Sequence, residues 1–144
     1  MKTGIKAGIL FRTALSILPV CFMCSACHRN TEDCAQVQIC TEVYVTVGVY
    51  VQDVVSTPVL LDSLHIKLRE TNESLPDENP DFQASNGYYV LVGDRSLKKL
   101  NKSGSRIRAT GYKNGKIMLD ENYVIGHDCC HVLKFSGKDT VTVQ

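Results

Sequence analysis

Cysteine and histidine side chains carry most of the potential chemistry of this sequence, and they lie in short clusters. The seven cysteines and the histidines near them are Cys21, Cys24, Cys27 and His28, then Cys34 and Cys40, and finally His127, Cys129, Cys130 and His131. Paired thiols form disulfides, thiolates and imidazoles bind zinc, and a C-x-x-C-H segment attaches haem. The chain around each cluster decides which of these chemistries is available.

The first 26 residues have the order of a secretory signal peptide. Lys2, Lys6 and Arg12 are the only charges before Cys27, and residues 13–23 form a short apolar run that ends at small residues. The run is shorter than the roughly 20 apolar residues that a membrane-spanning helix needs. We therefore predict that residues 1–26 are removed and that the rest of the chain is exported.

The end of this segment, Cys24-Ser25-Ala26-Cys27, resembles the lipobox of bacterial lipoproteins, in which small residues precede the cysteine that receives lipid. The resemblance implies cleavage after Ala26 and a diacylated Cys27 that anchors the protein in a membrane of the cell envelope, at the outer membrane or cell surface. Cys24 departs from the aliphatic residue that the family usually has there. Two acyl chains suffice for stable anchoring, at about 0.8 kcal/mol per buried CH₂. Secretion with an unmodified Cys27 is the alternative.

The same residues also have the C-x-x-C-H spacing of c-type haem attachment, in Cys24, Cys27 and His28. We favour lipidation, because cleavage would discard Cys24 and because Met118 is the only methionine left as a second haem ligand. A thioredoxin-like redox pair would need a βαβ context, which this β-rich sequence lacks. We predict no cofactor.

Four cysteines remain after the signal peptide and Cys27: Cys34, Cys40, Cys129 and Cys130. An even number in an exported chain predicts two disulfides. A bond between the vicinal pair would be strained, so we expect Cys34 and Cys40 each to reach one of Cys129 and Cys130, in either order. A bridge that closes a loop of roughly 90 residues contributes about 4 kcal/mol in the chain-entropy model.

A zinc site is the rival interpretation of the second cluster, because His127, Cys129, Cys130 and His131 are all possible ligands, and Cys34 and Cys40 could join them. Neighbouring residues of a strand point to opposite faces of the sheet, so Cys129 and Cys130 would not easily grip one ion. We predict disulfides and no metal ligand, and an envelope metal or haem protein stays as an alternative function.

Short β-strands must position these residues. Valines at positions 43 to 51 alternate with polar or aromatic residues, which is the period of a half-buried strand. Residues 37–55, 64–68, 88–92, 103–112, 116–125, 129–135 and 140–143 are the predicted strands, with a short edge piece at 59–61, a helical turn at 96–100 and an Asn114-Gly115 hairpin. We predict an all-β fold, an antiparallel β-sandwich of about seven strands at residues 37–144, behind a polar tether at 27–36.

Charge and motifs exclude several classes of function. The 16 basic residues nearly balance the 15 acidic ones, and removal of the signal peptide leaves 13 against 15, a net charge of −2. Nucleic-acid binding, which needs a basic stripe, is not expected. No G-x-S-x-G, H-E-x-x-H, P-loop or Rossmann pattern occurs, so we do not expect an enzyme.

Two groups of side chains are candidates for binding a ligand. Arg106, Arg108, Lys113 and Lys116 beside Tyr112 form a basic hairpin that could bind an anionic glycan or a partner, although a solvated outer face of a hairpin has the same pattern. Exposed aromatic rings would indicate glycan binding or adhesion, and the candidates are Tyr44, Tyr50, Tyr88 and Tyr89.

Two stretches, Gly87-Tyr88-Tyr89-Val90-Leu91 and residues 123–132, resemble small surface lipoproteins of Bacteroidetes. The resemblance implies an Ig-like or transthyretin-like sandwich of the carboxypeptidase-regulatory-like kind, and it implies fold and location rather than an activity. The predicted function is a lipid-anchored cell-envelope protein with a non-enzymatic binding or accessory module. A surface adhesion or glycan-binding subunit is the alternative, with a glycan or protein as partner.

Overall fold

The computed structural model describes residue 34, residues 39–79 and residues 86–144. This part of the chain forms seven strands and one 3-10 helix, so the predicted all-β class is confirmed. The elements in chain order are β1 Thr46–Asp53, β2 Ser63–Leu68, β3 Tyr88–Gly93, η1 Asp94–Lys99, β4 Ser105–Lys113, β5 Lys116–His127, β6 Val132–Ser136 and β7 Thr140–Val143. The predicted signal peptide and Cys27 lie outside the described residues.

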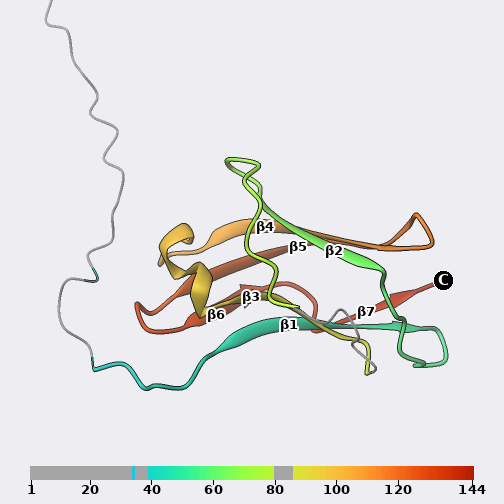
Figure 1. Cartoon of the computed structure of the whole chain (residues 1–144), viewed down its shortest axis with the longest axis horizontal. Coiled ribbons are helices and arrows are strands. Elements are labelled where there is room, and N and C mark those ends of the chain that lie inside the picture. The colour runs from blue at the N-terminus through green and yellow to red at the C-terminus, as the bar shows by residue number, and fades with distance from the viewer. Residues whose placement is uncertain (1–33, 35–38, 80–85) are drawn as a thin grey trace, which may run out of the picture.

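The strands form two sheets, one with the order β3-β1-β7 and the other with the order β2-β4-β5-β6 (Figure 1). Neighbouring strands are antiparallel except for β1 and β7, which pair in parallel from Tyr50↔Thr140 to Asp53↔Val143. The predicted antiparallel arrangement is wrong for this pair. Parallel neighbours are not joined by a short hairpin turn, so no local sequence signal predicts that the first and last strands pair.

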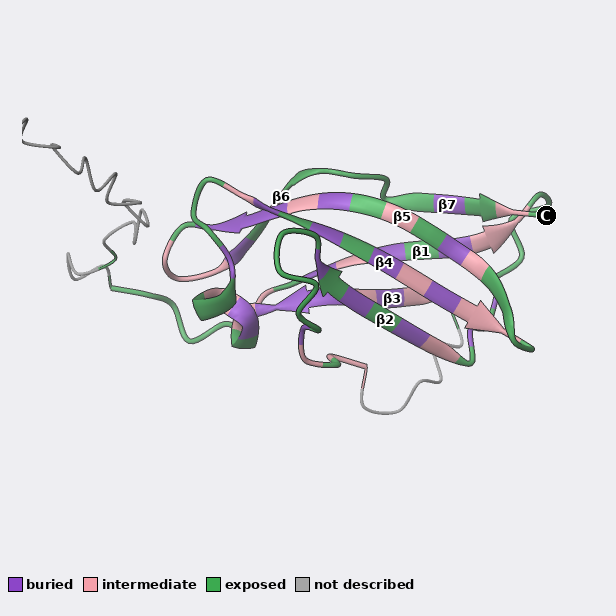
Figure 2. Cartoon of the chain, turned by 90° about the horizontal axis from the view of Figure 1, so that it is seen from above, coloured by how far each residue is buried: buried purple, intermediate pink, exposed green. Residues whose placement is uncertain are grey.

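The core lies between the two sheets and follows the predicted alternation of apolar residues. Val47, Val49 and Val51 of β1 are 9%, 0% and 1% exposed, and Ile107 and Ile125 of the other sheet are fully buried in the same cluster. Figure 2 shows buried and exposed positions alternating along the strands. Because side chains of successive residues point to opposite faces, the residues between these positions form the outer faces.

The first predicted strand is longer than the observed one. Val43 is 66% exposed, and β1 begins at Thr46, which lies opposite Gly93 at the end of β3. A strand needs a hydrogen-bonded partner, and the partner strand β3 ends at Gly93. The predicted edge piece at 59–61 is instead part of the core: Val59 and Leu61 are buried, and the Val59 amide donates to the Val51 carbonyl at 2.9 Å.

The predicted hairpin is present between β4 and β5. Asn114 and Gly115 have φ values of 51° and 73°, the left-handed pair that a two-residue turn between twisted strands requires. The side chain of Asp62 accepts a hydrogen bond from the Asn114 amide and so fixes this turn against the start of β2. In the described part of the chain, no helix is long and apolar enough to cross a membrane.

Candidate functional site

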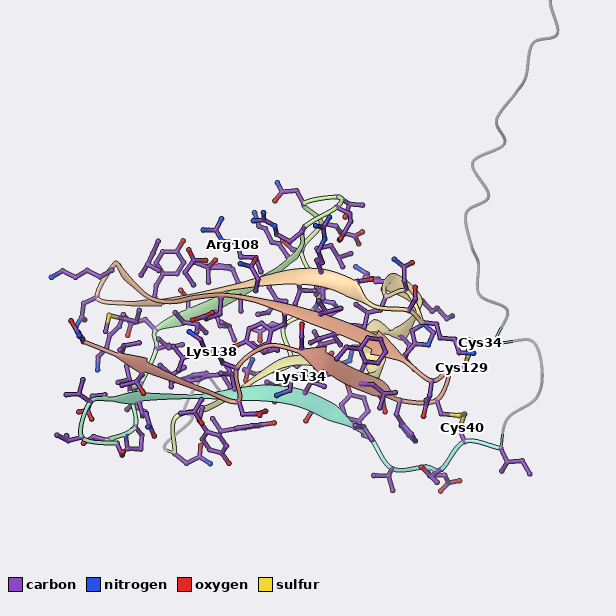
Figure 3. The ribbon with its side chains drawn as sticks, turned by 180° about the vertical axis from the view of Figure 1, so that it is seen from behind. Cys34, Cys40, Arg108, Cys129, Lys134 and Lys138 are labelled. Carbon is purple, nitrogen blue, oxygen red and sulfur yellow. A yellow bond between two sulfur atoms is a disulfide. The ribbon has the colours of Figure 1, made fainter. Side chains whose placement is uncertain are left out.

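Two disulfides close one end of the molecule, where the N-terminal chain approaches the sheets (Figure 3). Cys34 pairs with Cys129 and Cys40 pairs with Cys130, with Cα atoms 5.6 and 5.3 Å apart. This is one of the two arrangements that the sequence left open. The bonds join the segment before β1 to the β5–β6 loop, so these two segments are fixed at the same end of the molecule.

The two vicinal cysteines lie in the β5–β6 loop and not on a strand, because β6 begins only at Val132. Asp128 organises this loop: its Oδ1 accepts hydrogen bonds from the Cys130 amide at 2.9 Å and the His131 amide at 2.7 Å. Cys129 has a φ of 81°. The strand predicted at 129–135 is present as β6, but its predicted start at the vicinal cysteines is wrong, since Asp128 turns the chain before pairing resumes at Val132.

Asp94, the first residue of η1, holds three segments of this end together. Its Oδ2 accepts from the Val45 amide and its Oδ1 from the Val132 amide, both at 2.8 Å. The Nδ1 atom of His131 lies 2.8 Å from Oδ2, and the Nε2 atom of the same ring lies 2.9 Å from the hydroxyl of Thr41. The carboxylate thus links the chain before β1, η1 and the start of β6.

The pKa of the Asp94 carboxyl lies below its ordinary value. Burial alone would raise it, but the hydrogen bonds from His131, Val45 and Val132 stabilise the charged form and outweigh that effect. The pKa of Asp128 is lowered in the same way, chiefly by the backbone amides of His131 and Cys130. Both carboxylates are therefore structural anchors in their ionised form.

Among the described histidines that were predicted as metal ligands, His127 lies beside the sulfur atoms of Cys34 and Cys129. Ligand atoms of Cys34, His127 and Cys129 lie within 4.8 Å of one another. The sulfur atoms are bonded to each other, whereas zinc binds thiolates. The ring of His127 is already held, with Nδ1 accepting from the Cys129 amide at 3.0 Å and Nε2 lying 3.2 Å from the Leu100 carbonyl oxygen. The geometry is that of a disulfide beside a histidine ring that hydrogen bonds hold in place. Cys24, Cys27 and His28, the haem candidates, lie outside the described residues.

A second candidate site is a half-open hollow of about 500 Å³ on the outer face of the four-stranded sheet, within the size range of ligand pockets. Its floor is formed by outward-facing residues of β2 and β4, and the turn after β2 rises beside it (Figure 1). Arg108 projects from this face, far from the disulfide end (Figure 3). The side chains that give the hollow its character are His65, Lys67, Arg69, Arg108, Tyr112 and Ile117.

The turn at the side of the hollow, residues 69–72, is fixed by backbone hydrogen bonds. The Leu68 amide donates to the Glu73 carbonyl, and the Asn72 amide donates to the Leu68 carbonyl, both at 2.9 Å. The Arg69 amide donates to the Arg106 carbonyl of β4 at 2.8 Å. The chain after the turn runs back along the free edge of β2, so the position of Arg69 is set before any ligand arrives.

Charge at the hollow is unbalanced. The carboxylates nearby are already paired: Asp120 binds Arg108 through two hydrogen bonds of 2.6 Å, and Glu70 binds Arg106 at 2.9 Å. Lys67 and Arg69 are exposed, and neither forms an ion pair with a carboxylate of the described residues. Lys67 and Arg69 therefore remain outside these ion pairs at one end of the hollow, although the charge of Arg69 is near enough to help lower the pKa of Asp120.

The other end of the hollow is aromatic and apolar. The rings of His65 and Tyr112 meet edge to face with centroids 5.7 Å apart, and Ile117 is 55% exposed beside them. Tyr112 is paired with Ile117 in the β4–β5 ladder. The partly buried ring of Tyr112 and the exposed Ile117 can contact the apolar part of an amphipathic ligand, and the cations at the other end can contact its charged part.

The predicted binding residues are only partly those that the structure brings together. Arg108 and Tyr112 line the hollow, whereas Arg106 is engaged by Glu70 and lies outside its lining. Lys67 and Arg69 were missed as binding residues, because on the sequence they are the polar half of an alternating strand. The only signal for them was the run of cations at alternate positions in two strands, which pairing then placed side by side as Lys67↔Arg108.

The aromatic candidates separate in the structure. Tyr89 is 1% exposed and is not available to a ligand, because it points into the core and binds the β1–β2 connection. Tyr50 and Tyr88 form a ring pair at 4.9 Å on the outer face of the other sheet, with Tyr50 47% exposed. Tyr44 is half exposed, and its hydroxyl donates to Glu78 at 2.8 Å.

Comparison of the chain with protein-family models, curated proteins and solved structures gives no match. The chemistry of the two candidate sites therefore has to be argued from their own geometry. At the disulfide end, the sulfur atoms are bonded to each other and the carboxylates are hydrogen-bonded. The hollow contains cations outside the described ion pairs and the rings of His65 and Tyr112.

Proposed function

We propose that this protein is a lipid-anchored component of the cell envelope whose two-sheet domain is a non-enzymatic binding module. The observation that carries the proposal is the half-open hollow on the β2-β4-β5 face, which combines a turn with a fixed backbone, two cations outside the described ion pairs and an aromatic end. Ligand sites are concave and mostly preformed, with a few polar groups that fix the ligand. The polar groups here suit binding, because Lys67 and Arg69 form no ion pair with a described carboxylate.

Two observations support location in the envelope. Disulfides form and persist in oxidising compartments outside the cytoplasm, and this chain has two of them. Cys34 lies seven positions after Cys27, and a segment of that length spans at most roughly 25 Å. A lipid on Cys27 would therefore hold the disulfide end close to the membrane and leave the hollow facing sideways from it.

The finer fold that we propose is a sandwich of the Ig-like or transthyretin-like kind. Sheets of three and four strands match the strand numbers of the constant-type Ig arrangement. The parallel pairing of β1 with β7 departs from an all-antiparallel sandwich. A domain of this kind acts as a module that presents a site on its surface, which agrees with the position of the hollow.

The anchor is tested by the intact mass of the protein purified from membranes, with thiols alkylated before and after reduction. We expect a mass that begins at Cys27 with acyl chains attached, and four thiols that react only after reduction. The Cys27→Ala variant should appear in the soluble fraction. A species that keeps Cys24 with added haem, or thiols that become reactive on metal chelation, would contradict the proposal.

The binding module is tested by filling the hollow without changing its charge. Thr110 lies on its floor, and the substitution Thr110→Trp places a large ring there. We expect thermal stabilisation of the wild-type protein by at least one member of a panel of neutral and anionic polysaccharides, and loss of that stabilisation in the variant. Stabilisation that persists in Thr110→Trp would place the binding elsewhere and contradict the assignment of the site.

A further inference from the structure

We propose that the hollow binds an anionic polysaccharide chain, with the acidic group of one sugar at Lys67 and Arg69 and the ring of another against Tyr112. This inference rests on the proposed binding function and names the class of ligand. It follows from the charge balance at the hollow, from the rigidity of the turn that carries Arg69, and from the distance between the cationic and aromatic ends.

The charge balance favours an anion. Three described carboxylates near the hollow are already in ion pairs: Asp120 with Arg108, Glu70 with Arg106, and Glu73 with Lys99 at 2.7 Å. Lys67 and Arg69 then form an excess of two positive charges in a mature chain whose net charge is −2. A ligand with an acidic group removes this local excess and gains charge-assisted hydrogen bonds, which are about twice as strong as neutral ones.

The backbone at Arg69 and Lys67 is fixed before binding. Arg69 is part of the four-residue turn that is fixed by backbone hydrogen bonds at both ends, and Lys67 is in the middle of β2, opposite Arg108. Ordering flexible segments costs free energy on association, and a preset turn avoids that cost. A guanidinium also binds a carboxylate or sulfate through two parallel hydrogen bonds.

The hollow is long enough for more than one sugar. It runs along the strands from the Lys67–Arg108 row, through the His65–Thr110 row, to Tyr112 and Ile117. Outward-facing rows along a strand are about 7 Å apart, so the cationic and aromatic ends are separated by roughly 14 Å. Sugars have apolar C–H faces that stack on aromatic rings and acidic substituents at their edges, and a chain of them presents both at this separation.

A nucleic acid fits the site less well. Nucleic-acid binding requires a basic stripe that neutralises many phosphates, whereas the excess here is two charges on an acidic chain. A phospholipid headgroup would bring its phosphate to the cations but no ring to Tyr112. The polysaccharide uses both ends of the hollow, and the phospholipid uses one.

The test measures binding of the full-length protein in detergent micelles to immobilised polygalacturonate and chondroitin sulfate, with dextran as the neutral polysaccharide. The variant Lys67→Gln/Arg69→Gln removes both excess charges. The matched control is Lys98→Gln/Lys102→Gln, which removes two exposed cations that form no ion pair with described carboxylates and lie outside the hollow. Tyr112→Ala removes the ring, and soluble glycerol phosphate serves as a headgroup competitor.

We expect at least one anionic polysaccharide to bind, dextran not to bind, and binding to weaken with added salt. Lys67→Gln/Arg69→Gln should weaken binding about tenfold or more, since a hydrogen bond to a charged group contributes about 1.5 to 3 kcal/mol. The control variant should bind like the wild type, and Tyr112→Ala should weaken binding without removing its dependence on salt.

Four results would overturn the inference. Equal weakening in both double variants would show diffuse charge attraction and no site. Binding of glycerol phosphate that depends on Lys67 and Arg69, without binding of either polysaccharide, would identify a headgroup site. Binding of dextran that is lost in Thr110→Trp would leave the proposed binding module standing but remove its anionic ligand, whereas binding that ignores Thr110→Trp would remove both.

Discussion

Asp94 and Tyr89 each connect segments that are distant in the sequence. The carboxylate of Asp94 accepts hydrogen bonds from the backbone amides of Val45 and Val132. The hydroxyl of Tyr89, buried in the core, accepts from the Leu61 amide at 2.7 Å and donates to the Val59 carbonyl at 3.0 Å. Buried polar groups are stabilising only while their partners are present, so both residues are sensitive points of the fold.

Replacement of Asp94 by asparagine should change both the stability and its dependence on pH. The lowered pKa of Asp94 means that its carboxylate stabilises the fold at pH values above the pKa of the unfolded chain, and that this contribution is lost as pH falls through the folded-state pKa. We expect Asp94→Asn to lower the free energy of unfolding by about 2 kcal/mol at neutral pH. It should also reduce the loss of stability between about pH 6 and pH 3, as measured by urea unfolding.

The pH dependence should shrink in Asp94→Asn without vanishing, because the pKa values of Asp128, Asp120 and Glu70 are also lowered. Glu42→Gln, at an exposed acid before β1, is the control and should unfold like the wild type at both pH values. An unchanged pH dependence in Asp94→Asn would show that its carboxylate does not hold the three segments.

Removal of the Tyr89 hydroxyl should destabilise the connection between β1 and β2. In Tyr89→Phe, the Leu61 amide and the Val59 carbonyl lose a buried partner, and we expect the free energy of unfolding to fall by about 1 to 3 kcal/mol. Tyr50→Phe removes an exposed hydroxyl and should stay within about 0.5 kcal/mol of the wild type. Equal effects of the two substitutions in denaturant unfolding would contradict the structure around Tyr89.

At the scale of the elements, the β4–β5 hairpin is the best test of local backbone geometry. Gly115 has a φ of 73°, and a Cβ atom placed on it would meet nothing within 4 Å. The substitution Gly115→Ala therefore measures the backbone cost alone, and we expect a loss of about 1 to 2 kcal/mol. Asn114→Gly, which relaxes the neighbouring left-handed residue, should be close to neutral in the same thermal unfolding assay. A neutral Gly115→Ala would indicate a different turn.

Pairing between β2 and β4 creates the candidate site at the same scale. His65, Lys67, Arg108 and Thr110 belong to two strands that are distant in the sequence, and the register places Lys67 opposite Arg108 and His65 opposite Thr110. A shift of β2 by one residue against β4 would turn His65 and Lys67 toward the core. The apolar residues between them, such as Ile66 opposite Ala109, prevent that shift because they must be buried.

At the scale of the whole molecule, the disulfides should contribute unequally when removed in steps. Each closes a loop of 90 or more residues when it acts alone. With one bond intact, the second closes only the short ring between residues 34 and 40 and the vicinal pair. In the chain-entropy model, loss of either bond alone then costs about 2 to 3 kcal/mol, and loss of the remaining bond costs about 4 to 5 kcal/mol more.

The measurement compares urea unfolding of Cys34→Ser/Cys129→Ser, Cys40→Ser/Cys130→Ser and the variant that lacks all four cysteines. The two double variants should resemble each other, and the quadruple variant should lose more than the sum expected from two equal steps. If either double variant were as unstable as the quadruple variant, the two bonds would not close the same large loop.

The sequence by itself determined the features that depend on neighbouring residues. The alternating valines of β1, the Asn114-Gly115 turn and the all-β class follow from local periodicity and backbone preference, and the structure shows each of them. The even number of cysteines predicted two disulfides, and the strain of a bond between the vicinal Cys129 and Cys130 predicted that each would join an early cysteine to a late one.

Only the tertiary structure decided which distant residues meet. The parallel β1–β7 pair, the choice of Cys34 for Cys129, and the burial of Tyr89 leave no local pattern in the sequence. Lys67 and Arg69 were overlooked for the same reason. Whether a surface cation has an ion-pair partner depends on where carboxylates such as Asp120 and Glu70 lie in the fold. Charge pairing is a property of distances across strands, and those distances exist only once the sheets have formed.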